Sequence, residues 1–477
     1  MEPNVARGLR LTLSASALAL IVASGSAVAQ DSSVTTKQYD DGGVYEGMFK
    51  DGKQHGTGTY RLPNGYVYSG EWVDGEIRGQ GRAEFPNGSV YEGEFAAGKP
   101  EGQGQITFAD GGTYEGGWAD GKINGQGVAS YANGVRYEGG FSDALHDGQG
   151  RMESPNGYVY EGQWVRGIKE GAGKIQYPDG AVYEGQLQRG VREGKGTLTM
   201  PDGLTYVGEW SGGQINGTGV LTQPNGDVYE GALVEGKRQG IGRVTYANGD
   251  VYDGGFENDL RNGEGSFTGT DGYTYIGSWV QGRIEGAGTV TYPDGSVYEG
   301  TFANDLADGT GKIFYPDGNT YEGQWVAGVI EGTGVATYAN GLIYEGEFKD
   351  AKMHGQGKMT FADGYIYEGA WLNGQREGEG IAKYSDGTVY QGGFVAGQRE
   401  GQGTITMADG FSYTGAWAGG EIDGQGVATY ANGDVYEGTF VRGKRQGEGT
   451  IRYANGDERS GTWQDGALTE DVSTDSN

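Results

Sequence analysis

The chain has 477 residues, of which 100 are glycine, 10 are proline and none is cysteine. So much glycine without matching proline excludes a collagen-like chain, and an aromatic content of 12% excludes a disordered glycine-rich linker. The absence of cysteine excludes a disulfide framework and a cysteine-based metal site. The net charge of −30 argues against nucleic-acid binding, which needs clustered Lys and Arg, and disfavours an anionic membrane surface.

Residues 1–29 have the pattern of a secretory signal peptide. Arg7 and Arg10 flank the start of an apolar stretch that runs from Leu11 to Val22, and small residues lead to Ala27-Val28-Ala29. The apolar run is about 12 residues long, whereas a membrane-spanning helix needs about 20. We therefore expect export through a cleaved signal peptide, to the periplasm, the cell surface or the medium. Residues 30–40 are predicted to be a linker.

A repeat of 23 residues occupies positions 41–466. Tyrosine recurs at this interval from Tyr45 to Tyr436, and the next step falls on Arg459, which makes 19 units without an insertion. With the tyrosine as position 0, glycine stands at −3, +2, +11 and +13 wherever a unit contains those positions. Position +4 is always large and apolar, and it holds every tryptophan of the chain: Trp72, Trp118, Trp164, Trp210, Trp279, Trp325, Trp371, Trp417 and Trp463.

Alternation with period two predicts two strands in each unit. Positions 0, +2 and +4 share one face of the first strand, and +11, +13, +15 and +17 share the same face of the second. Segments such as Pro178-Asp179-Gly180 predict a type I turn followed by a left-handed glycine, which sets +15 opposite the next tyrosine. A longer loop over +6 to +9 is expected inside each unit. The predicted fold is all-β, an elongated single-sheet antiparallel meander of about 19 hairpins.

The apolar face of such a sheet carries a row of paired glycines beside rows of aromatic rings. We expect the rings at 0 and +4 to cover these glycines, which would let a single sheet be stable without a second layer. The last unit is altered, since Glu458 and Arg459 replace the usual residues, and the acidic tail 467–477 follows. Charge on an edge strand discourages further pairing, so this end is expected to form a cap.

The recurring string YEG-x-(W/F)-x-x-G-x-x-x-G-x-G resembles the MORN repeat, the membrane occupation and recognition nexus motif. It is clearest at Tyr160, Gly162, Gly171 and Gly173, and again at Tyr321, Gly323, Gly332 and Gly334. The resemblance covers about residues 40–466. It implies a β-hairpin array that acts as a scaffold, an assembly module or a peripheral lipid-binding element. A signal peptide and strong acidity distinguish this chain from membrane-linked members.

No group of residues predicts catalysis, a metal or a cofactor. His55, His146 and His354 stand in the turn before Gly-x-Gly and are expected to serve it. The Glu column at +1 predicts a solvated face, and the basic residues at +8 and +9 alternate with acidic ones, which predicts a self-neutralising edge. The tryptophan column at +4 is mainly structural and is also the candidate interaction surface.

The leading hypothesis is a non-catalytic exported scaffold for protein–protein interaction or assembly in the cell envelope. A protein partner or self-association is expected, through the apolar face or the N-terminal end. The alternative is a glycan-, cell-wall- or lipid-binding module that uses the aromatic column. An enzyme is the least favoured class.

The predicted meander has a consequence in solution. The mature chain should scatter X-rays with a radius of gyration well above the roughly 22 Å that compact scaling gives for about 450 residues. Small-angle scattering that fits a compact globule would contradict the meander.

Overall fold

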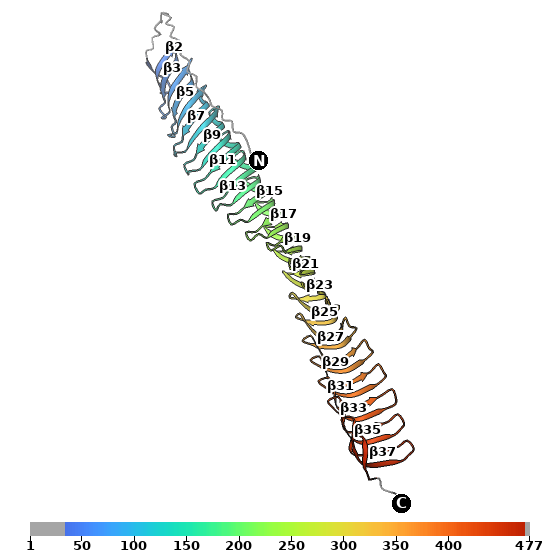
Figure 1. The fold of residues 1–477 in the computed structure, drawn as a ribbon. Helices are drawn as coiled ribbons and strands as arrows, with labels where there is room; N and C mark the ends of the chain where they lie inside the picture. Colours follow the sequence, from blue (N-terminus) through green and yellow to red (C-terminus); the bar gives the residue numbers. More distant parts are fainter. Residues whose placement is uncertain (1–33, 473–477) are drawn as a thin grey trace, which may run out of the picture. The chain divides into compact units, whose positions relative to one another are not determined.

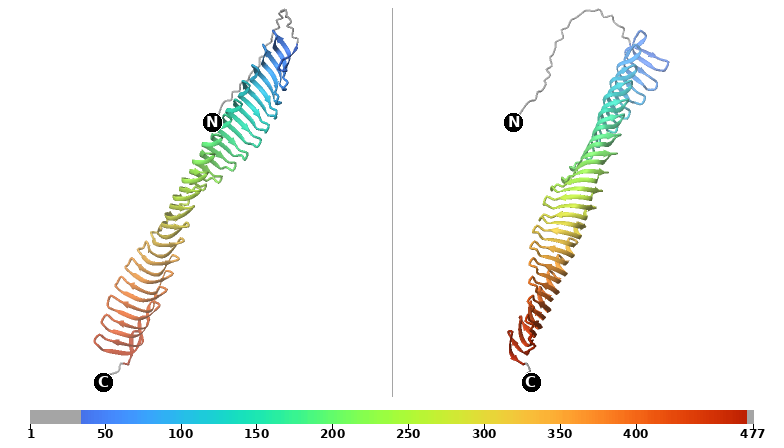
Figure 2. Two further views of the ribbon diagram at one scale, coloured as in Figure 1. Left: turned by 180° about the vertical axis from the view of Figure 1, so that it is seen from behind. Right: turned by 90° about the vertical axis from the view of Figure 1, so that its right-hand side faces the viewer.

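The computed structural model describes residues 34–472, and these form strands and turns without a helix. The predicted signal peptide lies outside the described residues. Within the described residues the chain divides into two compact units, 34–155 and 156–472. Each unit is an antiparallel meander in which consecutive strands lie side by side (Figures 1 and 2). The predicted all-β hairpin array is confirmed in both.

The first unit contains eleven strands that pair in chain order. They are β1 Thr35–Gln38, β2 Val44–Lys50, β3 Lys53–Arg61, β4 Val67–Val73, β5 Glu76–Glu84, β6 Val90–Ala96, β7 Lys99–Thr107, β8 Thr113–Ala119, β9 Lys122–Ser130, β10 Arg136–Ser142 and β11 Leu145–Glu153.

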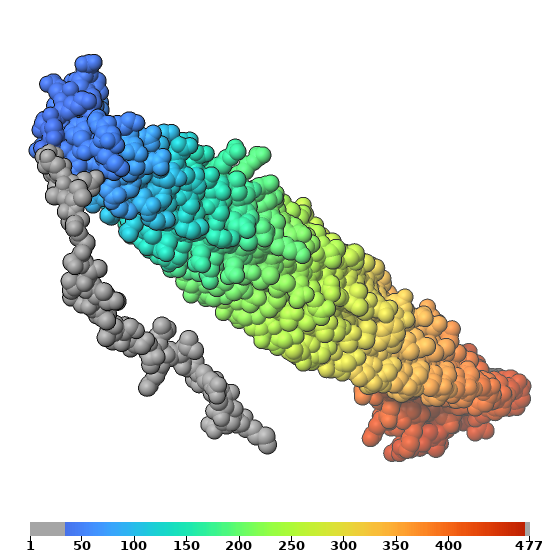
Figure 3. All heavy atoms as spheres, turned by 90° about the horizontal axis from the view of Figure 1, so that it is seen from above, coloured from blue at the N-terminus to red at the C-terminus, as the bar shows by residue number. Residues whose placement is uncertain are grey.

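The second unit continues the same pattern through twenty-eight strands. They are β12 Val159–Val165, β13 Ile168–Gln176, β14 Val182–Gln188, β15 Val191–Thr199, β16 Thr205–Ser211, β17 Gln214–Thr222, β18 Val228–Val234, β19 Lys237–Thr245, β20 Val251–Glu257, β21 Leu260–Thr268, β22 Thr274–Val280, β23 Arg283–Thr291, β24 Val297–Ala303, β25 Leu306–Phe314, β26 Thr320–Val326, β27 Val329–Thr337, β28 Ile343–Lys349, β29 Lys352–Thr360, β30 Ile366–Leu372, β31 Gln375–Lys383, β32 Val389–Val395, β33 Gln398–Thr406, β34 Ser412–Ala418, β35 Glu421–Thr429, β36 Val435–Val441, β37 Lys444–Arg452, β38 Glu458–Gln464 and β39 Ala467–Asp471. Within each unit the colours of the space-filling view change gradually, because every strand lies next to its neighbours in sequence (Figure 3).

The predicted register is confirmed between the two strands of a repeat and between repeats. Tyr160 on β12 stands opposite Ile175 on β13, and Ile175 in turn stands opposite Tyr183 on β14. Gly173 likewise faces glycine on both sides. The same rows recur in every repeat, so the apolar pattern stays on one face of the sheet. We call this the aromatic face, and the opposite one the polar face.

The turn between repeats is the predicted three-residue loop. The amide of Gly180 donates to the carbonyl of Tyr177 at 3.0 Å, and the amide of Tyr177 donates to the carbonyl of Ala181 at 2.8 Å. Gly180 has φ +90°, the left-handed conformation that favours glycine. A side chain also fixes the loop, since Asp179 accepts a hydrogen bond from the amide of Ala181.

The turn inside each repeat differs from the predicted loop over +6 to +9. Only +6 and +7 form the turn, as Arg166 and Gly167 do with φ of 50° and 83°, so Val165 pairs directly with Ile168. Two successive positive φ values define a type I′ hairpin turn. An irregularity between Gly162 and Trp164 shifts the register by two residues, so that Gly162 pairs with Gly173 as predicted. Position +4 therefore stands opposite +9 within its own hairpin.

The core is a single layer in which each tyrosine at position 0 lies over paired glycines. Tyr160 is fully buried, and its hydroxyl donates to the carbonyl of Gln163 at 2.7 Å. A Cβ built on Gly173 would stand 2.6 Å from Cε2 of this ring, which is far inside van der Waals contact. Only glycine fits beneath the ring, and the ring in turn covers backbone that glycine leaves bare.

The aromatic residue at +4 joins adjacent hairpins. The rings of Tyr298 and Trp325 meet edge to face with centroids 5.1 Å apart, and Tyr321 meets the same indole at 5.6 Å. The indole Nε1 of Trp325 donates to the carbonyl of Gly311 on the preceding strand at 3.3 Å. The Trp325 indole thus contacts two tyrosines and closes one backbone hydrogen bond, whereas Trp279 Nε1 has no hydrogen-bond partner within the described residues.

The two ends of the array extend beyond the predicted boundaries. Thr35–Gln38, within the expected linker, forms β1 and pairs with β2, and Ala467–Asp471, within the expected tail, forms β39 and pairs with β38. The altered strand that holds Glu458 and Arg459 was expected to be the edge, but it is the second-to-last strand. Its Arg459 pairs with Ile451, and the acidic strand β39 takes the outer position.

Truncation of a +4 ring should loosen the sheet locally. Trp325 is 7% exposed, so Trp325→Ala should cost about 3–5 kcal/mol. Because contacts join only neighbouring repeats, amides of β24 to β28 should exchange faster while distant strands keep their protection. Hydrogen exchange measures this, and Thr333→Ala, an exposed site nearby, is the control. Unchanged exchange in Trp325→Ala would mean that these rings are not structural.

Candidate functional site

The structure places the tryptophan column inside the sheet's own core. All nine indoles are between 3% and 8% exposed. Rings this deeply buried cannot stack on a ligand without a change in the sheet. Their burial agrees with the structural role expected for position +4. An interaction surface on the aromatic face must therefore consist of other side chains.

A second row of rings is half-exposed along the aromatic face. These rings stand at +17, beside the turn between repeats, and some have an aromatic partner at −2 of the next repeat. The row comprises Phe85, Phe108, Tyr131, Tyr177, Tyr246, Tyr292, Tyr315, Tyr338, Phe361, Tyr384, Tyr430 and Tyr453. Sequence analysis places +17 on the apolar face, but it does not distinguish this open row from the buried ones.

The basic side chains at +9 lie across the aromatic rings. The guanidinium carbon of Arg192 is 4.1 Å from the ring centroid of Trp210, and Arg445 is 4.0 Å from Trp463. Arg192 also donates from Nη2 to the carbonyl of Gly213 at 2.7 Å. These are cation–π contacts with a fixed backbone partner.

The basic residues at +8 behave differently, because they face the other side of the sheet. Lys99 contacts Asp120 and Lys122 contacts Asp143, each at 2.8 Å. The predicted self-neutralising edge therefore applies to +8, whereas the side chains at +9 belong to the aromatic face.

Hollows follow the aromatic face between the +9 side chains and the row at +17. In the first unit one of about 410 Å³ is lined by Phe85, Phe108 and Trp118. In the second unit one of about 700 Å³ is lined by Met359, Phe361, Tyr365, Trp371, Arg376 and Tyr384. Its walls are well defined, since Tyr365 and Tyr384 have centroids 4.9 Å apart and Arg376 donates to the Tyr365 hydroxyl at 2.5 Å.

Position +10 supplies an acceptor for the hairpin turn of the next repeat. Glu331 accepts the amide of Asp350 at 3.0 Å, Asp308 accepts that of Ala327 at 3.0 Å, and His55 accepts that of Asp74 at 3.4 Å. The turn role expected for His55 is therefore observed. His354 shares the position, but its buried Nδ1 has no hydrogen-bond partner within residues 34–472.

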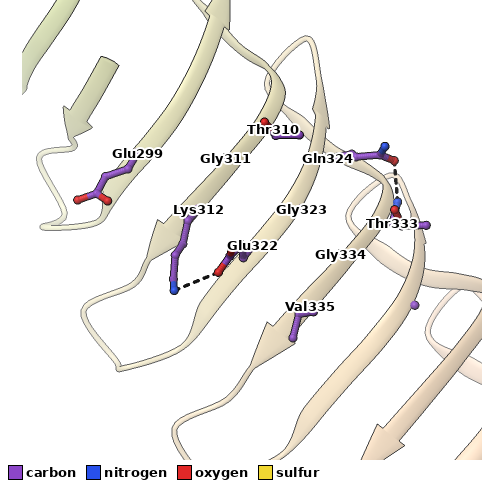
Figure 4. Close-up of a pocket in the computed structure, with 11 residues that line it drawn as sticks. Glu299, Thr310, Gly311, Lys312, Glu322, Gly323, Gln324, Thr333, Gly334 and Val335 are labelled. Atoms are coloured by element: carbon purple, nitrogen blue, oxygen red, sulfur yellow. Dashed lines mark hydrogen bonds and ion pairs between the residues drawn. The ribbon is translucent and has the colours of Figure 1, made fainter. Parts of the chain in front are cut away.

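The polar face carries the carboxylates at +1 and has a hollow of its own. This hollow, of about 710 Å³, contains Glu299, Lys312 and Glu322 in one cross-strand row (Figure 4). Lys312 Nζ is 3.1 Å from a Glu322 oxygen, and Gln324 accepts the amide of Thr333 at 2.8 Å. Paired, solvated carboxylates of this kind lack the distinct environments that acid–base catalysis needs.

Between residues 34 and 472, no three His, Asp or Glu side chains come together in a way that could hold a metal ion. No helix long and apolar enough to cross a membrane occurs over the same residues.

The family model for the MORN repeat matches the chain eighteen times in succession. The matches cover residues 45–65, 68–90, 91–113, 114–136, 137–157, 160–182, 183–205, 206–228, 229–251, 252–272, 275–297, 298–320, 321–343, 344–364, 367–389, 390–411, 413–435 and 436–458. The chain belongs to the MORN-repeat family. MORN repeats are protein- or membrane-interaction modules, and the family is generally non-catalytic. No curated protein matches this MORN-repeat chain.

Several solved structures are similar to part of the chain. The SAS-4 TCP domain of Drosophila melanogaster, in complex with a proline-rich motif of Ana2, is 19% identical over 33% of this chain and 89% of that one, with a TM-score of 0.22. The TCP10 domain of Danio rerio CPAP is 14% identical over 55% and 96%, with a TM-score of 0.14. A streptogramin B lyase is 12% identical over 61% and 90%, with a TM-score of 0.11. Scores this low carry no argument about the MORN array.

The burial of His146 predicts that the first unit loses stability in mild acid. Its ring stacks on Tyr137 with centroids 3.6 Å apart, and its Nε2 lies 2.7 Å from the hydroxyl of Tyr131. Burial lowers the pKa of His146 from 6.5 to about 4. Between these values the unfolded chain takes up a proton that the folded chain does not, so stability falls as the pH drops from about 6.5 to about 4.

The His146→Phe variant should lose this pH dependence because it keeps a ring and removes the titrating group. Hydrogen exchange of β10 and β11 across this pH range measures the effect, with the wild-type chain as reference. A histidine NMR titration that places the pKa of His146 near 6.5 would contradict the assignment.

Proposed function

We propose that the chain is an exported, non-catalytic MORN-repeat scaffold of the cell envelope, which binds a protein partner along its aromatic face. The half-exposed rings at +17 carry the proposal. They recur at one fixed position of the repeat, as at Tyr292, Tyr315 and Tyr338, and some of them, such as Phe361 and Tyr384, border a hollow that the sheet leaves open. Aromatic rings with a polar tip are enriched where proteins meet.

Repetition supports a scaffold rather than a single binding pocket. An identical contact offered by consecutive repeats converts the second and later contacts into intramolecular events, so weak contacts sum to stable binding. The net charge of −30 favours a partner with basic residues and disfavours anionic lipid. A second copy of the chain is a weaker candidate, because like charge opposes self-association.

Export is the second part of the proposal and rests on residues 1–29. The predicted cleavage after Ala29 would release a chain that begins at Gln30. N-terminal sequencing of the protein from envelope fractions tests this part, and an intact Met1 in those fractions would contradict it.

Glycan binding is the second candidate function, because half-exposed rings are also able to stack on sugar faces. Tyr315, at 37% exposed, is one of the more accessible rings of the row. The two candidates differ in the chemistry of the bound molecule, which the following experiment determines.

The experiment places a photoreactive phenylalanine analogue at Tyr338, in the ring row, and separately at Phe314. Phe314 is 38% exposed but stands at +16, on the polar face. We expect protein adducts from position 338 in intact envelopes and far fewer from 314. Adducts that resist protease but yield to glycan-cleaving enzymes would support the second candidate. Equal labelling at both positions would contradict binding on the aromatic face.

A further inference from the structure

The rings at +17 form their most regular row in the second unit. Tyr292, Tyr315, Tyr338 and Phe361 occupy this position in four consecutive repeats, and all four are partly accessible. The hydroxyls of the three tyrosines make no hydrogen bond within the described residues, so they are available to donate to a ligand. Successive rings lie two strand spacings apart, which corresponds to about 9.6 Å along the sheet.

This spacing discriminates between the conformations that a bound peptide can take. A polyproline II helix advances about 9.3 Å per turn of three residues and so presents every third side chain to the same row. An α-helix returns to the same face after seven residues, or about 10.5 Å. An extended strand changes face at every residue, so positions three apart point in opposite directions. Polyproline II fits the row with a drift of about 1 Å over four rings.

The surface beside these rings is apolar. In the repeats of this stretch, position +9 holds Ile284, Ala307, Ile330 and Met353, where several other repeats have arginine. Ile284 and Ala307 are buried, so Ile330 and Met353 are the partly accessible members. Arg376 ends this stretch with its guanidinium across the rings of Tyr367 and Phe394. A proline ring therefore meets aliphatic and aromatic carbon here, without a buried cation to desolvate.

Both borders of this stretch are acidic. The turns between repeats contribute Asp294, Asp317 and Asp363, and position +10 of the hairpins contributes Glu285, Asp308 and Glu331. Within residues 34–472 each of these six carboxylates accepts a hydrogen bond from a backbone amide, and none of them has a basic side chain as its partner. The charge of the borders is complementary to a ligand that carries basic side chains between its prolines.

We propose that the aromatic face between Tyr292 and Phe361 binds a proline-rich, basic segment of a partner protein in the polyproline II conformation. The segment lies along the array with one turn per repeat, its prolines between successive rings and its basic side chains toward the acidic borders. The tyrosine hydroxyls donate to its backbone carbonyls, which a polyproline II helix leaves unpaired. This inference rests on the proposed function and names the chemistry of the partner.

The test uses the full mature chain and synthetic peptides built from Pro-Pro-Arg triplets. Affinity, measured by titration calorimetry at physiological salt, should rise with each added triplet until one triplet faces each of the four rings. A Gly-Ser-Arg peptide of equal length and charge should bind at least tenfold more weakly. Equal affinity of the two peptides would mean that charge alone accounts for binding, which would overturn the proposal.

Four variants locate the site. Tyr338→Ala should weaken the triplet peptide by about tenfold or more, and Tyr338→Phe by less, because it loses only the hydroxyl. Phe314→Ala removes a ring of similar exposure from the polar face and should leave affinity unchanged. Tyr315→Ala provides a second ring deletion if Tyr338→Ala alters hydrogen exchange of the sheet. Affinity that is unaffected by both ring deletions would overturn the assignment.

The outcome separates this inference from the function on which it rests. Protein adducts from position 338 together with no binding of the triplet peptides would overturn the polyproline II partner and leave the scaffold standing. No protein adducts at all would overturn the scaffold. Binding of a soluble glycan or of anionic vesicles in place of the peptides would overturn the peptide ligand.

Discussion

The packing of a tyrosine ring on a pair of glycines is the contact on which the rest of the structure depends. A sheet normally needs a second layer to bury its apolar face, and here the ring at position 0 supplies that cover from within the sheet. Tyr160 shows the geometry, since its hydroxyl reaches the Gln163 carbonyl while its ring leaves no room for a side chain on Gly173. Because this contact recurs in successive repeats, the stability of the array depends on contacts between neighbouring repeats.

The sequence predicts the register because apolar side chains must share one face of the sheet, which limits how the strands can pair. The predicted pairing sets Tyr160 opposite Ile175 and Ile175 opposite Tyr183. It does not predict the turn inside each repeat, since a two-residue turn with a bulge and a four-residue loop preserve the same parity. Residues as different as Ala97 and Arg166 take φ near 50° at +6, so the turn has no side-chain signature there. The basic residues at +8 and +9 face opposite sides because they are consecutive residues of one strand.

The candidate site is less predictable than the fold because composition does not determine which rings are covered. The sequence suggests the tryptophans as the interaction surface, but their indoles lie in the core, as Trp325 does between two tyrosines. The accessible rings are the less regular tyrosines and phenylalanines at +17. These rings lie beside the turn between repeats, where an aromatic partner at −2 covers only some of them, as Tyr365 does Tyr384.

A double-mutant cycle between the ring and its glycine tests the central contact most directly. Gly334→Ala places a methyl group against the ring of Tyr321, and Tyr321→Leu removes that ring. Hydrogen exchange gives the local opening free energy of β26 and β27 for both single variants and the double variant. If the tyrosine ring covers the glycine, the methyl group of Gly334→Ala should be strongly destabilising with tyrosine at position 321 and much less so with leucine there. The expected coupling free energy is about 1 kcal/mol or more. Additive effects would contradict it.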